Sequence, residues 1–156
     1  AHKSELGEVF LNLENQKSVK NALKKISKKH VIIEKMIGNA IVELLVGIVH
    51  DPAHGMLLTI GAGGIFTEIV SDTSSLLLPS SEDEILKCFN QLKVSKIVKG
   101  YRGFSGVDEN QIVDAIMKIQ EFVLENRDKI FEIEINPLIV TNSEVVVADA
   151  LIRKVK

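Results

Sequence analysis

The polar residues best suited to chemistry gather near the carboxy-terminal end, in the segment FEIEINPLIVTNSEVVVADAL. Glu132, Glu134 and Asn136 alternate along an apolar run, so on a β-strand they share one face. Asp149 follows the next apolar run, and a tight hairpin would bring it near Asn136. Carboxylate and amide oxygens are the hard ligands that Mg²⁺ combines with nucleotide phosphates. From the residues alone, an exposed polar face and a magnesium site both remain open.

A glycine-rich segment, Gly61 to Gly64, is the second candidate. Glycine lets a backbone approach a phosphate and present its N–H groups to it. The sequence GAGG lacks the GK[ST] of a Walker loop and is not a GxGxxG motif. From the residues alone, a phosphate-facing loop and a simple turn both remain open.

Two smaller features complete the candidates. His2 begins an HKS cluster, and histidine can accept a phosphoryl group or move a proton, although a terminal histidine in isolation says little. His30, His50 and His54 show no metal-ligand spacing, so we interpret them as surface or turn residues. Residues 34–37 close one predicted strand and Glu43 opens the next. They would flank a flat ligand or, alternatively, be exposed acids near a turn.

Helices and strands must hold these residues in place. Apolar residues at helical spacing predict a helix over 19–26, with a basic solvated face, and two later helices behind the capping-box pairs Ser81–Glu84 and Asp108–Gln111. The last helix would bury Ile112, Ala115, Ile116, Ile119, Phe122 and Val123. Strands are predicted over 9–13, 31–37, 41–49, 56–60, 65–70, 130–140 and 145–151, the last two as a hairpin. This mixture predicts an α+β (or α/β) fold with a largely antiparallel sheet and flanking helices.

Composition sets the class of protein. The 156 residues fit one domain, and 46% hydrophobic with 26% charged residues is typical of a globular chain. A net charge of −2 argues against a nucleic-acid surface or a polybasic membrane patch. No apolar run approaches the roughly 20 residues of a membrane span, and the polar start is no signal peptide. The lone Cys88 predicts a buried thiol in a reducing compartment, and we expect a cytoplasmic protein.

Seven segments taken in order resemble a known family. They are HKSELGEVFLNL, IIEKMI, VELLVGIVHDPAHG, GAGGIFTEIVSD, KGYRG, EIEINPLIV and VADALI. Together, from His2 to about Arg153, they resemble the ATP-grasp domain of NDP-forming acyl-CoA synthetases, specifically the ADP-forming acetate–CoA ligase type. The resemblance implies an ATP-grasp fold and the reaction acid + CoA + ATP ⇌ acyl-CoA + ADP + phosphate. The resemblance further implies that this domain would exchange phosphoryl between ATP or ADP and a phosphohistidine.

The resemblance also implies partners and roles. CoA and the phosphohistidine would belong to other domains or a separate subunit, and we expect an oligomer. Asn136 and Asp149 would ligate Mg²⁺, with Glu134 as a third candidate, and Glu43 would hold the ribose hydroxyls. An interdomain hinge along adenine would comprise Glu34, Lys35, Met36 and Ile37. Gly61, Gly63 and Gly64 would face the transferred group. His2 would be a phosphate contact or a phosphoryl relay. Arg102 would be an anion contact or a structural salt bridge.

Two departures from the family pattern bear on these roles. Relatives begin earlier, with a strand that carries a nucleotide-binding lysine, so we interpret residues 1–156 as an ATP-grasp domain without its N-terminal part. Where many relatives have two glycines, this chain has Gly7 and Glu8. The alternative function is a non-catalytic, regulatory ligase-like module of a larger protein such as a protein acetyltransferase. The acid substrate is not encoded in this segment, because the acyl pocket belongs to another domain.

Overall fold

The first 38 residues form one of two units in the computed structural model, which describes residues 9–64, 71–103 and 106–155. The unit Ala1–Gly38 contains helix α1 (Gln16–Leu23), whose N-cap Asn15 accepts a 2.9 Å hydrogen bond from Ser18 N. The predicted strands over 9–13 and 31–37 are wrong, since neither stretch is a strand. A strand needs a neighbour for its N–H and C=O groups, and the described part of this unit offers none. Ile32 is accordingly 84% exposed.

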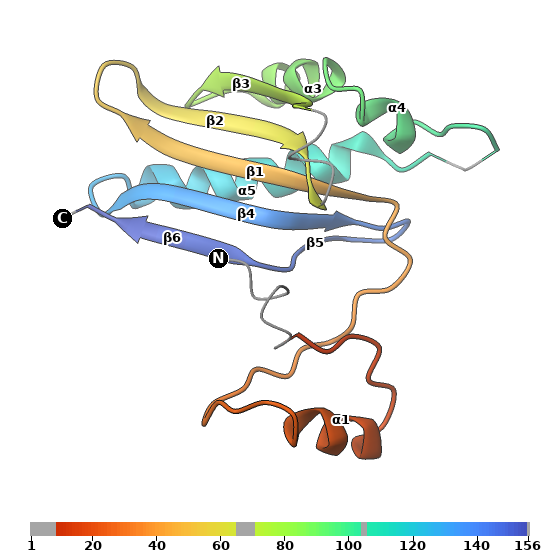
Figure 1. The fold of residues 1–156 in the computed structure, drawn as a ribbon. Coiled ribbons are helices and arrows are strands. Elements are labelled where there is room, and N and C mark those ends of the chain that lie inside the picture. The colour runs from red at the N-terminus through yellow and green to blue at the C-terminus, as the bar shows by residue number, and fades with distance from the viewer. Residues whose placement is uncertain (1–8, 65–70, 104–105, 156) are drawn as a thin grey trace. The chain divides into compact units, whose positions relative to one another are not determined.

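The second unit, Asn39–Lys156, is built on one sheet (Figure 1). Its strands are β1 (Val42–Asp51), β2 (Gly55–Ala62), β3 (Thr73–Leu77), β4 (Ile130–Val140), β5 (Val145–Val147) and β6 (Ala150–Lys154). The strand order is β3-β2-β1-β4-β5. Strand β5 pairs with the end of β4, and β6 pairs with the first half of β4. All of these pairings are antiparallel. The largely antiparallel sheet is confirmed, whereas β3 was not predicted, and the predicted strand 65–70 lies outside the described residues.

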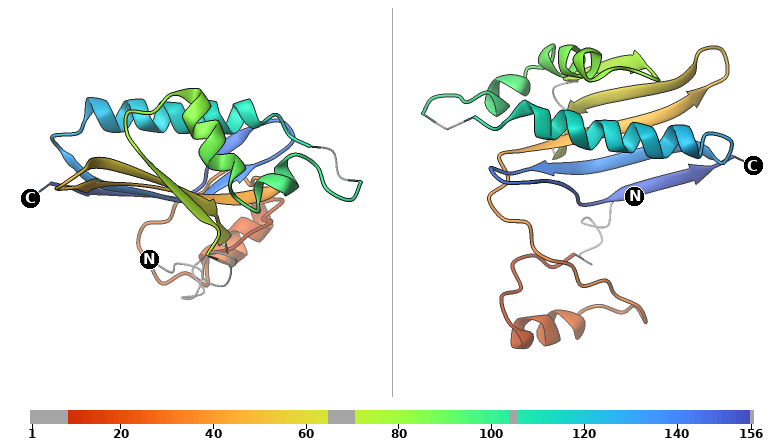
Figure 2. Two further views of the ribbon diagram at one scale, coloured as in Figure 1. Left: turned by 90° about the horizontal axis from the view of Figure 1, so that it is seen from above. Right: turned by 180° about the vertical axis from the view of Figure 1, so that it is seen from behind.

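Helices cover one face of this sheet (Figure 2). Helix α3 (Glu82–Asn90) begins with the predicted capping box, in which Ser81 N donates to Glu84 Oε2 at 2.8 Å. A short α4 (Ser95–Val98) follows, and it was not predicted. The long α5 (Glu109–Glu125) is capped by Asp108, which accepts from Asn110 N at 3.0 Å without the reciprocal Gln111 bond.

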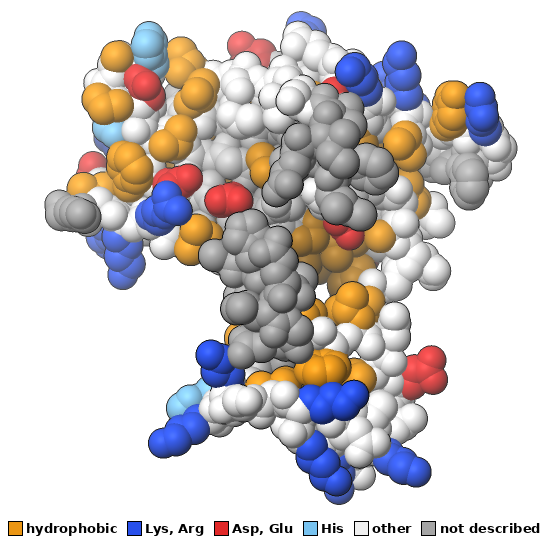
Figure 3. All heavy atoms as spheres, viewed as in Figure 1, with side chains coloured by type: hydrophobic (Ala, Val, Ile, Leu, Met, Phe, Trp, Pro, Cys, Tyr) orange, Lys and Arg blue, Asp and Glu red, His pale blue; other side chains and the backbone are white. Residues whose placement is uncertain are grey.

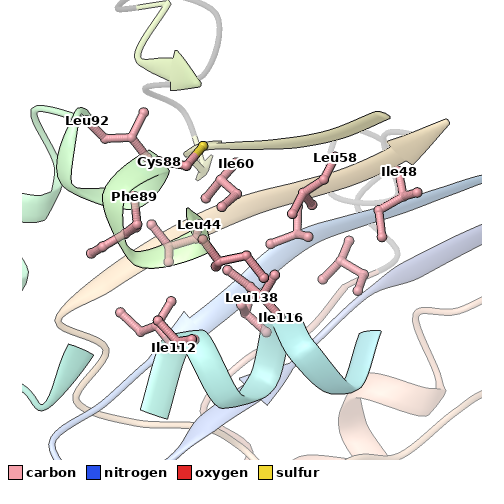
Figure 4. Packing of buried hydrophobic residues seen from close by; sticks show 14 of the residues in the cluster. Leu44, Ile48, Leu58, Ile60, Cys88, Phe89, Leu92, Ile112, Ile116 and Leu138 are labelled. Carbon is pink, nitrogen blue, oxygen red and sulfur yellow. The ribbon is translucent and has the colours of Figure 1, made fainter. Parts of the chain in front are cut away.

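The core lies between this helical layer and the sheet (Figure 4). Leu44 and Leu138 from neighbouring strands are 0% exposed, as are Phe89 of α3 and Ile116 of α5. Truncating such a residue to alanine costs about 2–5 kcal/mol. Cys88 is buried as predicted. The predicted burial of Phe122 is wrong, because this side chain lines a surface groove beside α5 and is 47% exposed.

Candidate functional site

Strands β1 and β4 each present one row of side chains to the core and the other to the opposite face. In β1, Val42, Leu44, Val46 and Ile48 are buried, and the residues between them point the other way. We call this opposite side the second face; it carries Glu43 and Gly47 of β1 and Glu134 and Asn136 of β4. Figure 3 views the molecule from this side, and acidic side chains are visible in red over the sheet. The predicted site residues of the second unit therefore belong largely to one surface.

The end of this face near Glu43 is shaped by the glycines of the GAGG segment. Gly63 N donates a 2.7 Å hydrogen bond to Glu43 O. A β-carbon on Gly63 would lie 2.8 Å from the carbonyl carbon of Leu44, which is too close for any side chain. Gly64 has a φ of +66°, and a β-carbon there would lie 2.6 Å from Glu43 Oε2. The structure thus brings Glu43 and two of the three predicted glycines together.

Gly61, the third predicted glycine, faces a different neighbour. A β-carbon there would lie 2.8 Å from Thr73 Cγ2 and 2.9 Å from Asp72 O. Beside it, Ala62 N donates to Asp72 O at 3.0 Å. Gly61 is therefore needed for close packing against the start of β3, and its predicted contact with a phosphate remains a prediction.

Asn136 and Asp149 meet where the ladder on either side of β4 is irregular. Leu44 pairs with Leu138 and Val46 with Ile135, so β4 has one extra residue, a β-bulge, at 136–137. On the other side Asn136 N donates to Asp149 O at 3.2 Å, in the gap between β5 and β6. The predicted single strand over 145–151 is broken at this point. Because of the bulge, Ile135 before it and Leu138 after it both point into the core, whereas Asn136 does not.

Glu134 lies two residues along β4 from Asn136, half-buried on the same face. It is in register with Gly47 on one side and with Leu151 on the other. The third acid of the motif differs, because Arg153 Nη1 donates to Glu132 Oε2 at 2.7 Å. This ion pair occupies Glu132 with a structural partner, so the ligand candidates that remain are Glu134, Asn136 and Asp149.

These three residues fit a magnesium ion that keeps other ligands. Two carboxylates and one amide oxygen are a suitable donor set for Mg²⁺, which commonly binds one or two protein carboxylates, waters and phosphates. Over the described ranges, no three His, Cys, Asp or Glu side chains form a metal-binding group. By donor chemistry these residues suit a metal that shares its ligands with a nucleotide, and their role as metal ligands remains a prediction.

The contacts predicted for the other site residues are not tested by the structure. Glu34, Lys35, Met36 and Ile37 belong to the first unit, in a stretch without regular structure, and their adenine contact remains a prediction. His2 lies outside the described residues. Arg102 is exposed in the loop between α4 and α5, with a φ of +47°, and its guanidinium lies 5.3 Å from the centre of the Tyr101 ring. Its anion-binding role also remains a prediction.

A groove of about 550 Å³ lies on the core side, between α5 and the strands at the β6 edge. Its lining is mostly apolar, including Phe122, Ile133 and Ile152, and includes none of the predicted site residues. It is thus separate from the second face. Within the described ranges, no helix has the length and apolar character needed to span a membrane.

Comparison with known proteins decides the family. The model of the ATP-grasp domain family matches residues 1–153. The β subunit of acetate–CoA ligase (ADP-forming) I from Pyrococcus furiosus is 31% identical over 160 residues, covering 96% of this chain and 68% of that subunit. This chain is an ATP-grasp domain of the ADP-forming acetate–CoA ligase family. The recognition from sequence motifs and the predicted ATP-grasp fold are thereby confirmed.

Longer relatives and a solved structure agree with this assignment. Acetate–CoA ligase (ADP-forming) II from Archaeoglobus fulgidus is 32% identical over 155 residues, which is 97% of this chain and 22% of that protein. A solved acetyl-coenzyme A synthetase 1 from Ca. Korarchaeum cryptofilum has a TM-score of 0.87 at 31% identity, covering 97% of this chain and 70% of that chain. That structure contains coenzyme A and Mg-AMPPCP, with a phosphohistidine segment pointing towards the nucleotide binding site. The chain thus spans about a fifth of the Archaeoglobus relative and about two thirds of the Pyrococcus β subunit.

Sequence reasoning missed two features of this site. A single glycine within a strand, such as Gly47, carries no motif. In the sequence Asp72 is only the last letter of a family motif, although its carboxylate accepts two backbone hydrogen bonds, from Lys93 N and Val94 N. An acid directly before a short strand is a weak signal, and nothing in the sequence identifies its partners twenty-odd residues later.

Proposed function

We propose that this ATP-grasp domain exchanges phosphoryl between ATP or ADP and a phosphohistidine in an ADP-forming acid–CoA ligase. The overall reaction would be acid + CoA + ATP ⇌ acyl-CoA + ADP + phosphate. The observation that carries the proposal is the second face, which holds Glu43 beside Gly64 at one end and the Asn136–Asp149 pair farther along. The Mg-nucleotide and phosphohistidine segment of the Korarchaeum relative support the same arrangement.

In this proposal the residues act by binding and orienting. Glu43 accepts hydrogen bonds from the ribose hydroxyls, and the Gly63–Gly64 backbone approaches the phosphates because no β-carbon intervenes. Asn136 and Asp149 hold the metal from adjacent strands, with Glu134 as the third ligand. When bound, Mg²⁺ neutralises charge on the phosphates during transfer. The chain's own contribution is to fix these oxygens on one rigid sheet.

The first unit and the α4–α5 loop supply the remaining proposed contacts. Residues 34–37 lie along adenine through their backbone groups, and Arg102 contacts an anion. The full ATP site also needs an N-terminal segment with a nucleotide-binding lysine. Residues 1–156 alone should therefore bind ATP weakly, and tight Mg²⁺-dependent binding in titration calorimetry would contradict this part of the proposal.

CoA and the carboxylic acid would bind to other domains or a second subunit, in an oligomeric enzyme. The Pyrococcus relative, which is a β subunit, supports the arrangement with a second subunit. The Archaeoglobus relative, of which this chain covers 22%, supports the arrangement with further domains on one chain. We also propose a cytoplasmic location, supported by the free, buried Cys88 thiol, which suits a reducing compartment.

His2 has two proposed roles, phosphoryl relay and phosphate contact. Attack on the γ-phosphate needs a neutral imidazole, which is accessible near pH 7 because an ordinary histidine pKa is about 6.5. As a relay, His2→Ala in the complete enzyme would abolish ATP formation from acyl-CoA and spare acyl phosphate formation. His2→Asn separates the roles, because Asn donates a hydrogen bond but carries no phosphoryl group. Retention of most of the ATP-forming rate by His2→Asn would exclude the relay.

The decisive experiment for the overall function is a coupled assay of the complete protein with ATP, Mg²⁺, CoA and a panel of acids. We expect acyl-CoA and ADP with at least one acid, and Asp149→Asn should lower kcat about 100-fold, as for loss of one charge-stabilising group. Glu132→Gln is the matched control, since Glu132 is already paired with Arg153, and its kcat should change less than about threefold. Binding of Mg-ATP without turnover of any acid would instead favour the regulatory module.

A further inference from the structure

Asp72 is a buried carboxylate that none of the proposed nucleotide contacts uses. The residue is 9% exposed, and each carboxylate oxygen has its own donor. Lys93 N donates to Oδ1 at 2.8 Å and Val94 N donates to Oδ2 at 2.9 Å. Burying a charged group is costly unless such bonds compensate it. The carboxylate therefore joins the start of β3 firmly to the turn between α3 and α4.

The backbone of the same residue holds the glycine segment. Asp72 O accepts from Ala62 N at 3.0 Å and lies 2.9 Å from where a β-carbon of Gly61 would be. One residue further, Gly63 N donates to Glu43 O at 2.7 Å. A continuous chain of contacts thus runs from the α3–α4 turn through Asp72 to the glycine segment and to Glu43.

The local backbone shows why this anchor is needed. Ser71, directly before Asp72, has a φ of +42°, in the left-handed region that a residue with a side chain rarely adopts. Such a conformation persists only where the surroundings hold it in place. The two carboxylate bonds and the bond from Ala62 provide that restraint, because they fix residue 72 on both sides.

We propose that Asp72 is a positioning residue for the nucleotide: its carboxylate holds the Gly61–Gly63 segment, and through it Glu43, against the α3–α4 turn. This inference rests on the proposed function for its effect on the nucleotide. Its structural part, the fixing of the glycine segment, can be measured independently. Asp72 would not touch the nucleotide itself.

The test uses Asp72→Asn, which keeps the shape of the side chain. Asparagine has one acceptor oxygen, so only one of the Lys93 and Val94 N–H groups keeps its partner. In the complete enzyme we expect the KM for Mg-ATP to rise about tenfold, equivalent to 1.4 kcal/mol. Neither kcat nor the KM for CoA should change by more than about twofold.

A matched control weakens the same turn by another route. The buried Ser95 hydroxyl donates to Leu92 O at 2.7 Å, and Ser95→Ala removes this bond without touching the glycine segment. Both variants should unfold at lower denaturant concentration than the wild type. Only Asp72→Asn should raise the KM for Mg-ATP and speed amide hydrogen exchange at Ala62 and Gly63.

Three results would overturn the proposal. They are an unchanged KM and unchanged exchange in Asp72→Asn, an equal rise of KM in Ser95→Ala, and failure of Asp72→Asn to fold, which would make the carboxylate a requirement of the whole fold. Absence of ligase activity in the wild type would instead refute the proposed function. In that case faster exchange at Ala62 and Gly63 in Asp72→Asn still supports the positioning role, and unchanged exchange overturns it.

Discussion

Gly63, just after β2, and Gly47, in the middle of β1, are the same residue type in opposite surroundings. A β-carbon on Gly63 would lie within 3 Å of the backbone of both Glu43 and Leu44. At Gly47 the nearest atom would be Ile133 O, at 4.0 Å. The fold therefore requires glycine at 63 and would accept a side chain at 47. A glycine that the fold does not need often leaves room for a ligand or another backbone.

Gly47 lies next to one of the proposed metal ligands. It stands on the second face between Glu134 and Thr59, its register partners in β4 and β2. Thr59 Oγ1 in turn lies 2.8 Å from Ser75 Oγ. A polar row thus crosses the sheet beside the proposed metal ligand Glu134. Gly47 is the position in this row that has no side chain. Substitutions at these glycines distinguish effects on the stability of the fold from effects on ligand binding.

Gly63→Ala should have the largest effect on stability. The clashing atoms are backbone atoms of β1, which cannot rotate away, so strands β1 and β2 must separate locally. We expect a loss of about 3 kcal/mol in the free energy of unfolding, as for an overpacked interior. Urea denaturation of wild type and variant measures it, and a loss below about 1 kcal/mol would show that the hairpin end adapts.

Gly64→Ala should have an intermediate effect. The left-handed φ of +66° costs a residue with a side chain about 1 kcal/mol. The close neighbour here is the carboxylate end of Glu43, which can move aside. We therefore expect the KM for the nucleotide to rise, because the Glu43 carboxylate is displaced. Combined with Glu43→Ala, the two changes should be non-additive in a double-mutant cycle, and strict additivity would disconnect Gly64 from Glu43.

Gly47→Ala should leave stability almost unchanged, or raise it by about 0.5 kcal/mol, because glycine weakens a strand interior. Phosphoryl transfer should nonetheless slow if a ligand occupies the space beside Glu134. Ser75→Thr is a suitable control, since it adds one methyl group farther along the same row. Destabilisation of Gly47→Ala comparable to that of Gly63→Ala would remove the contrast between the two places.

The turn at the other end of the β1–β2 hairpin offers the smallest test. The His54 side chain, at 2.9 Å, and then the backbone N–H groups of Ala53 and His54 lower the pKa of Asp51 below 3.8. Ionised Asp51 thus stabilises the fold above its unfolded-state pKa, and this contribution is lost as pH falls through the lower folded-state value. In His54→Ala the pKa should move up towards 3.8 in an NMR titration. An unmoved pKa would assign the shift to the backbone bonds alone.

Local patterns in the sequence were sufficient for several elements. The alternation of β1 and β4, the Ser81–Glu84 capping box and the buried Cys88 were all predicted correctly, because each depends on near neighbours or on burial periodicity. The stretches 9–13 and 31–37 failed for a matching reason. Alternating apolar residues favour a strand, yet a strand forms only where another lies beside it.

For the site, the sequence alone determined the chemical types and the family. The resemblance of seven ordered motifs to a known family was enough to recognise an ATP-grasp domain. Tertiary structure decided which of those groups meet. A bulge interrupts the ladder at 136–137, an ion pair with Arg153 engages Glu132, and the Asp72 carboxylate accepts from Lys93 N and Val94 N. These outcomes depend on strand register and on contacts between distant segments, which no local pattern of residues encodes.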